Sequence, residues 1–307
     1  MTTTTYVPSD ADRAHLPDSY RSEPRYLGYR DSDAARPFAK YYRDKNEPIQ
    51  AHVHDALLAG MAPAEHGYDI DDAARMLARP GYHHMETGWT RLDNGVTAIA
   101  CHTHMPGVTA AMWDWWFGWL GGDSARYKLW CPEAHQFIAV GDDRSGDRSL
   151  TDRQRYTGNV SYADEYLGGV LHRLTIRFVD PAAMGIDESP DTTHIFARVG
   201  FSHLPVLFGW LIHQIRPTSD GAEMRSRFFL NHPQIIDVPA QSLPSNLLAR
   251  SLTRRSARQF ANAALPRIGR RLLPRNIGYD LLYHCATEMN HLATFLPALY
   301  EEFHGTP

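Results

Sequence analysis

Cysteine is scarce in this chain of 307 residues, which contains only Cys101, Cys131 and Cys285. The number is odd and no two of them have C-x-x-C spacing, so a disulfide framework and a cysteine-rich zinc module are both excluded. Such sparse cysteine usage fits a reducing compartment. We therefore expect a cytoplasmic protein.

Long apolar runs are also missing, because the two longest candidates are interrupted by Asp114 and by His213. A membrane-spanning helix needs ~18 apolar residues. The N-terminus, MTTTTYVPSDADR, has no basic segment followed by an apolar one and so does not resemble a signal peptide. The sequence predicts an unexported protein without a membrane partner.

Positive charge is not in excess, since 31 Lys and Arg face 35 Asp and Glu, a net charge of −4. No global positive field exists, so nucleic acid is not an expected partner. One stretch departs from this balance: residues 240–275 hold no Asp or Glu and are rich in arginine. We interpret it as a solvated helical insert that pairs with acidic residues elsewhere, and a membrane-surface or nucleic-acid patch is the alternative. Its arginines are Arg250, Arg254, Arg255, Arg258, Arg267, Arg270, Arg271 and Arg275.

Histidine and tryptophan are abundant, with 17 and 7 residues, in a composition that is otherwise globular at 43% hydrophobic and 21% charged. Histidine suits metal or acid-base chemistry, and tryptophan suits a large aromatic pocket. The segment Val108–Gly122 concentrates four tryptophans and predicts a buried helix or a pocket wall.

The pattern along the chain changes near residue 80. Residues 1–46 lack periodicity and predict an extended arm that orders only against something else, such as a second subunit. Short helices are expected at 48–61 and 70–78, and residues 1–80 are interpreted as an N-terminal arm and helical subdomain that serves dimerisation.

Beyond residue 80 the pattern predicts strands and one long helix. Residues 88–101 read as a hairpin around Asp93-Asn94-Gly95, and 203–216 are ambiguous between helix and strand. Tyr279–Phe303 carries an apolar helical stripe. Further strands are expected at 171–178, 194–201 and 222–230.

The strongest local signal for chemistry is YHCATEMNHL, where His284 and Glu288 are four residues apart and share one helix face. This spacing can seat two ligands on one metal. Glu288 and His291 form the alternative Glu-x-x-His spacing, but such sites need a second copy on another helix, and none is found. The spacing leaves the remaining ligands open among His83, His84, His102, His104, His135, Glu165, His172, His203 and His213, with His102-x-His104 as the chief rival pair.

Other catalytic motifs are missing. No G-x-S-x-G, G-x-G-x-x-G or Walker sequence occurs. A cysteine nucleophile at Cys131 or Cys285 would lack the flanking residues of known families.

Five motifs occur in order along the chain: DWWFGW (114–119), ARYKLWCPEAH (125–135), DEYLGG (164–169), GAEMRSRF (221–228) and YHCATEMNHL (283–292). Together they resemble one known family, that of 2,4-diacetylphloroglucinol hydrolase and phloretin hydrolase, from about Tyr82 to the C-terminus. The resemblance implies zinc-dependent hydrolysis of the carbon–carbon bond between an acyl group and a phloroglucinol ring. It also implies a helix-grip fold similar to Bet v 1 and an N-terminal dimerisation region.

The resemblance also implies site residues. The family's zinc ligands fall on His135, Glu165, His284 and Glu288. Its ring-contacting tyrosine falls on Tyr127, and its catalytic histidine falls on His213, with His203 as the alternative. A second family tyrosine falls on Phe228 or Phe229, which favours an acyl-phenol other than the diacetyl compound.

The sequence and the resemblance together predict an α+β fold, with an antiparallel sheet around a long C-terminal helix over residues 81–307. The expected cofactor is Zn²⁺, the expected partner is a small acyl-phenol substrate, and the expected assembly is a homodimer. The alternative is a non-catalytic or cyclase-type helix-grip protein that binds an aromatic, polyketide-like ligand. A remoter one is an interaction protein that acts through the arginine-rich stretch.

Overall fold

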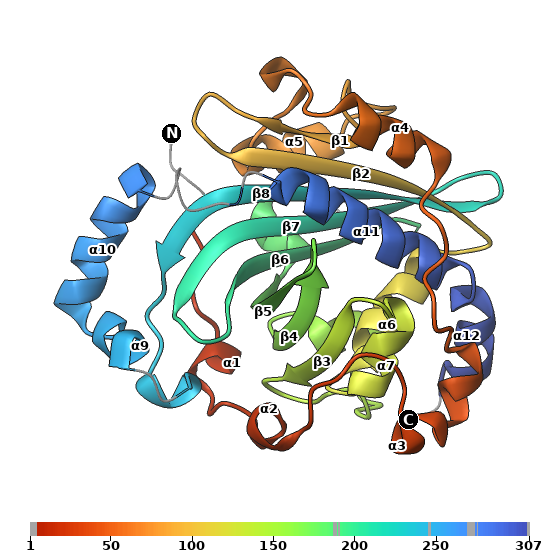
Figure 1. The fold of residues 1–307 in the computed structure, drawn as a ribbon, viewed down its shortest axis with the longest axis horizontal. Coiled ribbons are helices and arrows are strands. Elements are labelled where there is room, and N and C mark those ends of the chain that lie inside the picture. The colour runs from red at the N-terminus through yellow and green to blue at the C-terminus, as the bar shows by residue number, and fades with distance from the viewer. Residues whose placement is uncertain are drawn as a thin grey trace.

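One antiparallel sheet organises the protein, whose computed structural model describes residues 5–186, 189, 191–244, 247–268, 274 and 276–305. Its eight strands follow the order β1-β2-β8-β7-β6-β5-β4-β3 (Figure 1). They are β1 (Gly88–Arg91), β2 (Thr97–Pro106), β3 (His135–Val140), β4 (Val160–Leu167), β5 (Val170–Val179), β6 (Thr193–Phe201), β7 (Val206–Pro217) and β8 (Gly221–Ile235). The predicted α+β class with an antiparallel sheet is confirmed.

Local sequence explains several of these strands. The β1–β2 hairpin turns where predicted, with Gly95 at a φ of 87° that disfavours other residues. Strand β7 resolves the ambiguous segment 203–216. Both faces of β7 are covered, so its apolar residues run without the polar alternation that marks a half-exposed strand.

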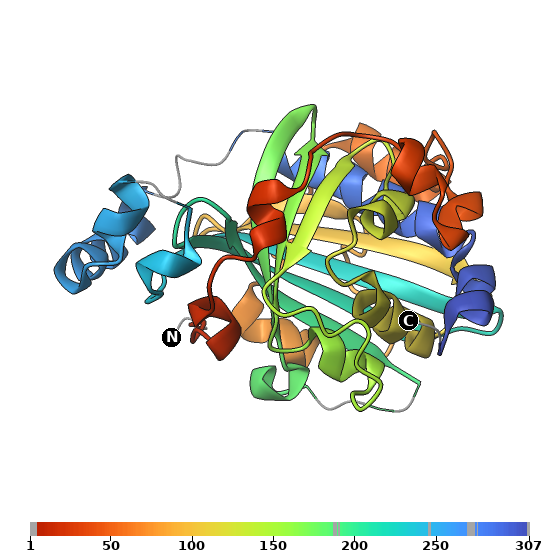
Figure 2. The same cartoon turned by 90° about the horizontal axis from the view of Figure 1, so that it is seen from below.

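The helix α11 (Ile277–Ala293) lies along the concave side of the sheet and packs on β2 and β1 (Figures 1 and 2). Its buried stripe includes Leu282, Cys285, Met289 and Leu292. The prediction of a single helix over 279–303 was wrong, because α12 (Leu296–Phe303) is separate. Proline 297 in the first turn of α12 explains the break, since its ring clashes with the carbonyl group four residues earlier.

Three helices close one end of the concave side: α6 (Ala110–Leu120), α7 (Ser124–Trp130) and α8 (Asp152–Tyr156). Thr109 caps α6 by accepting from Met112 N. The four tryptophans of the predicted segment are buried in the main core, with Trp115 stacked on Trp119. They are core residues, and the segment's contribution to the cavity wall comes from Phe117, Gly118, Leu120 and Gly121.

The N-terminal residues lie against their own chain. They form α1 (Asp10–Arg13), α2 (Asp18–Ser22), α3 (Asp31–Ala34), η1 (Pro37–Tyr41), α4 (Ala51–Ala59), η2 (Ala64–His66), η3 (Ile70–Asp72) and α5 (Ala73–Leu77). Tyr6, Leu16 and Phe38 are buried, so the described part of this arm, residues 5–46, packs on its own chain and is not a bare extended segment. The residues of α5 pack against the convex face of the sheet on Phe196, Trp210 and other side chains. The division at residue 80, with its dimerisation role, stays a prediction.

The remaining elements are η4 (Pro181–Met184), η5 (Ala240–Ser242), α9 (Leu247–Leu252) and α10 (Arg255–Ile268). Helices α9 and α10 project from one end of the sheet (Figure 2), which agrees with a helical insert in the arginine-rich stretch. They still contact the sheet: Ala249 of α9 lies in the second core cluster, and Asn262 Nδ2 of α10 donates to the backbone oxygen of Ile235 at 2.9 Å. Arg258 pairs with Asp237 at 2.8 Å. Arg270, Arg271 and Arg275 lie outside the described residues. No described helix is both long and apolar enough to cross a bilayer.

Candidate functional site

A buried cluster of histidines and carboxylates forms where α11 meets β3 and β4. His135, His284 and Glu288 offer ligand atoms that lie within 4.8 Å of one another. His135 Nε2 is 3.4 Å from Glu288 Oε2 and 3.9 Å from Glu165 Oε2. His284 Nε2 is 3.7 Å from Glu288 Oε2 and 3.8 Å from Glu165 Oε1. Among the described residues, this is the one group of three or more His, Cys, Asp or Glu side chains arranged for a metal.

Backbone structure brings the four side chains together. His284 and Glu288 are one helical turn apart on α11. His135 opens β3 and lies opposite Glu165 of β4 in the strand register. The turn after β4 allows a close approach to α11, because a Cβ on Gly168 would lie 2.5 Å from Asp280 Cγ. Glycine at this position therefore lets Glu165 reach His284.

The orientation of His135 fits a metal ligand. Its Nδ1 is 3.0 Å from the backbone oxygen of Tyr127, and its ring stacks on the Tyr127 ring at 3.9 Å between centroids. An Nδ1–H that donates to a carbonyl oxygen leaves a lone pair on Nε2. This Nε2 is buried, faces two carboxylates and has no hydrogen-bond partner. An unsatisfied acceptor among acidic oxygens is the arrangement that a bound cation relieves.

Burial dominates the electrostatics of the cluster. It lowers the pKa of His135 to about 4 and raises the pKa of Glu288 to about 8, with the charge of Glu165 adding to the latter shift. Burial also acts to raise the pKa of Glu165, but His284 and His135 outweigh it, and the pKa is lowered. Imidazole nitrogens and carboxylate oxygens suit zinc, and also other divalent transition metals.

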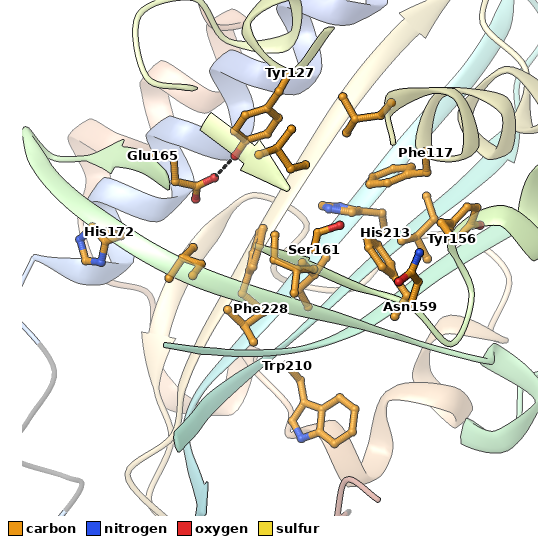
Figure 3. Close-up of a pocket in the computed structure, with 18 of the residues that line it drawn as sticks. Phe117, Tyr127, Tyr156, Asn159, Ser161, Glu165, His172, Trp210, His213 and Phe228 are labelled. Atoms are coloured by element: carbon orange, nitrogen blue, oxygen red, sulfur yellow. Dashed lines mark hydrogen bonds between the residues drawn. The ribbon is translucent and has the colours of Figure 1, made fainter. Parts of the chain in front are cut away.

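The cluster opens into a cavity of about 250 Å³ on the concave side of the sheet. Figure 3 shows Tyr127, Glu165 and His172 toward one end and Phe117 and Tyr156 toward the other. Most of the wall is apolar: Trp130, Ile138, Leu174, Ile176, Phe178, Ile195, Val199, Leu211, Phe228 and Leu230 contribute to it. A largely apolar cavity lined by a limited set of polar groups is typical of a small-molecule site.

Two further predicted residues line this cavity. Tyr127 donates from its hydroxyl to Glu165 Oε2, and burial raises the pKa of its phenol well above the ordinary value. His213 Nδ1 is 2.8 Å from Ser226 Oγ, and burial lowers the pKa of His213 to about 3. Its imidazole is therefore uncharged at neutral pH.

The alternative histidine is elsewhere. His203 is exposed in the turn between β6 and β7, next to the Phe201 ring, and does not line the cavity. The structure thus brings Tyr127 and His213 to the cavity and leaves His203 outside it. Of the two phenylalanines, Phe228 lines the cavity, whereas Phe229 packs in the second core cluster.

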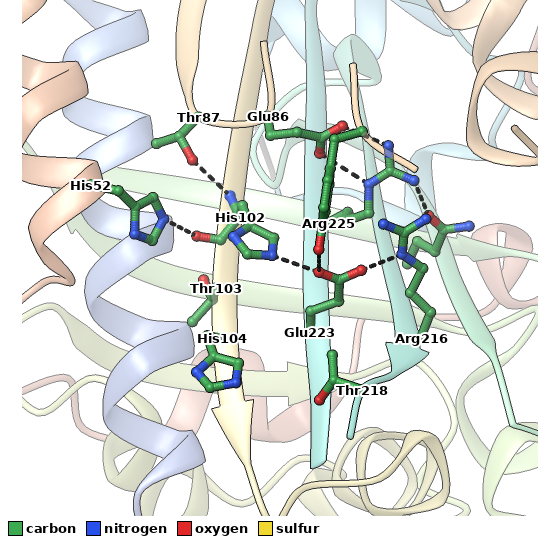
Figure 4. A network of polar contacts seen from close by, with 12 residues as sticks. His52, Glu86, Thr87, His102, Thr103, His104, Arg216, Thr218, Glu223 and Arg225 are labelled. Carbon is green, nitrogen blue, oxygen red and sulfur yellow. Dashed lines mark hydrogen bonds and ion pairs between the residues drawn. The ribbon is translucent and has the colours of Figure 1, made fainter. Parts of the chain in front are cut away.

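The rival pair His102-x-His104 does not converge on a common point (Figure 4). His102 Nε2 is 2.8 Å from Glu223 Oε2, and His104 Nε2 is 3.0 Å from Asp220 Oδ1. Glu223 also accepts from Tyr82 and Arg216, so its oxygens are already used. The pair takes part in a polar network and shares no metal-ligating arrangement.

Sequence reasoning missed β3, β4 and the cavity role of Ser161. The side chains of residues 160–167 alternate between the two faces of β4, with Ser161 and Glu165 directed into the cavity and Tyr162 in the opposite core cluster. Polar and apolar residues do not alternate in this segment, so the glycines that bound it, Gly158 and Gly168-Gly169, were the local signal that it offered.

The family model described as "DAPG hydrolase PhiG domain" matches residues 68–301. The 2,4-diacetylphloroglucinol hydrolase of Pseudomonas protegens is 30% identical over 98% of this chain and 97% of its own. The phloretin hydrolase of Eubacterium ramulus is 27% identical over 90% of this chain and 93% of its own.

Solved structures give weaker likenesses. The crystal structure of Ara h 8.0201 has a TM-score of 0.29 at 14% identity and covers 57% of this chain and 97% of its own. A norcoclaurine synthase of Thalictrum has a TM-score of 0.33 at 10% identity, over 67% of this chain and 96% of its own. The family match, in contrast, spans most of the chain, and the relatives are aligned over nearly their full lengths. The chain therefore belongs to the DAPG hydrolase family, which confirms the predicted resemblance and the prediction that it is a hydrolytic enzyme.

Proposed function

We propose that this protein is a metal-dependent hydrolase that cleaves the carbon–carbon bond between an acyl group and a phloroglucinol-type ring, releasing a carboxylic acid and the phenol. The observation that carries the proposal is the orphaned Nε2 of His135 among two carboxylates and a second imidazole, at the end of an apolar cavity. The names of the relatives support the substrate class. The cofactor would be Zn²⁺, held by His135, Glu165, His284 and Glu288 on a helix-grip fold.

The reaction balances with water alone. The bond between the acyl carbon and the ring carbon breaks, the acyl carbon gains hydroxyl from water, and the ring carbon gains a proton. A phloroglucinol ring makes this departure feasible, because its keto tautomer carries the proton on that ring carbon and leaves as an enolate. Without such hydroxyl groups, the leaving aryl carbon would be a poor leaving group.

Zinc bound at the cluster would lower the pKa of a water ligand to about 7 and polarise the oxygen it contacts. The protein's own groups would do the rest. Tyr127 keeps its proton, because its phenol pKa is raised, and directs its hydroxyl to Glu165 and to a ring hydroxyl of the substrate. His213 pairs through Nδ1 with Ser226 and leaves Nε2 as the atom that would move a proton to or from the substrate. Aromatic and aliphatic walls exclude bulk water from the reacting bond.

The test begins with metal analysis of the untagged protein, because a polyhistidine tag would confound it. We expect near one zinc per chain, lost from Glu288→Gln and retained by His102→Ala, which changes a histidine outside the cavity. Phloretin and 2,4-diacetylphloroglucinol are then incubated with each protein, and the released phenol and acid are measured by mass spectrometry.

Full metal content in Glu288→Gln would refute the ligand assignment. A metal-free wild type that folds, takes up no zinc and releases no product would instead support a binding protein or a cyclase of the same fold.

We also propose a cytoplasmic homodimer in which residues 1–80 contribute to the interface. The described cysteines are all free thiols, which suits a reducing compartment. Light scattering of the full chain would show twice the mass of 34.8 kDa for a dimer. The mass of a monomer at micromolar protein concentration would refute the proposed dimer and would leave the hydrolase proposal unaffected.

A further inference from the structure

Ser161 lies in the wall of the cavity, and its side-chain hydroxyl has no hydrogen-bond partner among the described residues. It lies on β4, four residues before Glu165 and on the same face of the strand, and its residue is 7% exposed. None of the described residues gives its side chain a hydrogen bond. Other buried serines are satisfied: Ser202 Oγ is 2.8 Å from the Tyr20 hydroxyl, and Ser226 Oγ is 2.8 Å from His213 Nδ1.

The neighbours of Ser161 along β4 and in the adjacent strands do not bond its hydroxyl. Its neighbours in the strand register are Val140 of β3 and Ile176 of β5, and both line the cavity. The nearest polar lining residue along the chain, Asn159, is already engaged: its Oδ1 accepts from Asp142 N and Val160 N, and its Nδ2 donates to Asp142 O. A hydroxyl group in the largely apolar wall of a cavity is available to bond a polar group of a ligand, or water when no ligand is bound.

The location of Ser161 defines what could bond it. Four residues of β-strand separate the Cα atoms of Ser161 and Glu165 by about 13 Å. Figure 3 places Ser161 between the Glu165 end of the cavity and the Phe117 end. A ligand that reaches both the cluster and Ser161 is therefore elongated and has a polar group remote from the metal-bound end.

We propose that the Ser161 hydroxyl selects substrates by hydrogen-bonding a substrate hydroxyl group remote from the carbonyl that is cleaved. This inference rests on the proposed function. The remote hydroxyl has two sources: the ring hydroxyl opposite the acyl group, and a hydroxyl at the far end of the acyl chain. Both present the same chemistry to Ser161, and matched substrates distinguish them.

The experiment compares wild type with Ser161→Ala on three ketones. The first is phloroglucinol with a phenylpropanoyl chain, the second carries a further hydroxyl at the far end of that chain, and the third lacks the ring hydroxyl opposite the acyl group. The intrinsic reactivity of each ketone cancels in the ratio of wild-type to variant kcat/KM. We expect this ratio to be about 2–10-fold larger for a ketone that carries the recognised hydroxyl than for its partner without it, as for loss of one hydrogen bond.

The pair of ketones that shows the difference identifies the source of the hydroxyl. The control is Ser202→Ala, which deletes the same group from a buried serine outside the cavity and should leave all ratios equal. Thermal melting of both variants checks the fold, and Ser161→Ala should melt no lower than wild type, because it loses no internal hydrogen bond.

Equal ratios for all three ketones in Ser161→Ala would overturn the proposal, since they would mean that Ser161 bonds only water. If wild type cleaves none of the three ketones, the proposed function fails. Equilibrium binding of the same ketones to wild type and to Ser161→Ala then tests the role of Ser161. The loss of affinity in Ser161→Ala should be larger for the ketone that carries the recognised hydroxyl than for its partner without it.

Discussion

The N-terminal arm is held to the sheet by a buried ion pair, and its removal gives a large predicted effect. Asp12 is 2% exposed and accepts through Oδ1 from Arg177 Nε, through Oδ2 from the Tyr6 hydroxyl, and from Ser9 N at 2.9 Å. Arg177, on β5, is 4% exposed. In Asp12→Ala the guanidinium of Arg177 is left in a buried position without its carboxylate.

The expected cost is about 3–5 kcal/mol, the range for breaking a buried pair by removing one partner. Chemical denaturation of Asp12→Ala should show this loss in the free energy of unfolding. Faster proteolysis at Arg13 and Arg21 should accompany it, because the arm separates first. The double variant Asp12→Ala/Arg177→Met should recover part of the loss, since it leaves no buried charge.

The matched control is Lys45→Ala, whose pair with Glu133 is exposed, at 82% and 41% of the two side chains. Such surface pairs contribute about 0–1 kcal/mol. An Asp12→Ala variant that loses no more stability than Lys45→Ala would refute the reasoning that the arm is docked on its own chain through this pair.

Three further predictions concern the sheet, the cavity and a helix contact. Burial acts to raise the pKa of Glu86, but its ion pairs with Arg225 and Arg227 of β8 outweigh this effect and lower the pKa to about 2. The stabilisation that Glu86 contributes is therefore full above pH 4.5 and is lost as the pH falls toward 2. Acid titration of stability should therefore be steeper between these values for wild type than for Glu86→Gln, and equal slopes would contradict the assignment. Phe228→Tyr should raise kcat/KM for 2,4-diacetylphloroglucinol by about 2–10-fold, by one added hydrogen bond, whereas Phe229→Tyr on the other face should not. Gly118→Ala should lower the melting temperature, because its Cβ would lie 2.6 Å from a backbone oxygen of α8, while Gly146→Ala meets nothing within 4 Å and should melt like wild type.

Local sequence patterns were sufficient to predict the elements that have one apolar face. The β1–β2 hairpin and strand β5 follow from turn residues and from alternation, both of which act over a few positions. The helical spacing of His284 and Glu288 is equally local, because a turn of helix aligns residues four apart. These features formed where predicted.

Local sequence patterns did not predict the elements whose structure depends on packing against distant parts of the chain. Strand β4 is buried on both faces and contains Asp164 and Glu165, which read as a polar loop. Asp164 Oδ2 accepts from Arg25 Nε of the N-terminal arm at 2.7 Å, a contact between residues far apart in the chain. The break between α11 and α12 depended on a single proline within an otherwise unbroken apolar stripe.

The sequence by itself determined the class of fold, the pair of potential ligands on one helix and, through ordered motifs, the family. Only the tertiary structure decided that His135 and Glu165 face that pair, that His213 and not His203 reaches the cavity, and that Phe228 and Ser161 line it. The physical reason is the range of the interactions. Helical and strand periodicity is set by neighbouring residues, whereas the meeting of β3, β4, β7 and α11 is set by strand pairing and core packing between segments that are separated in the chain.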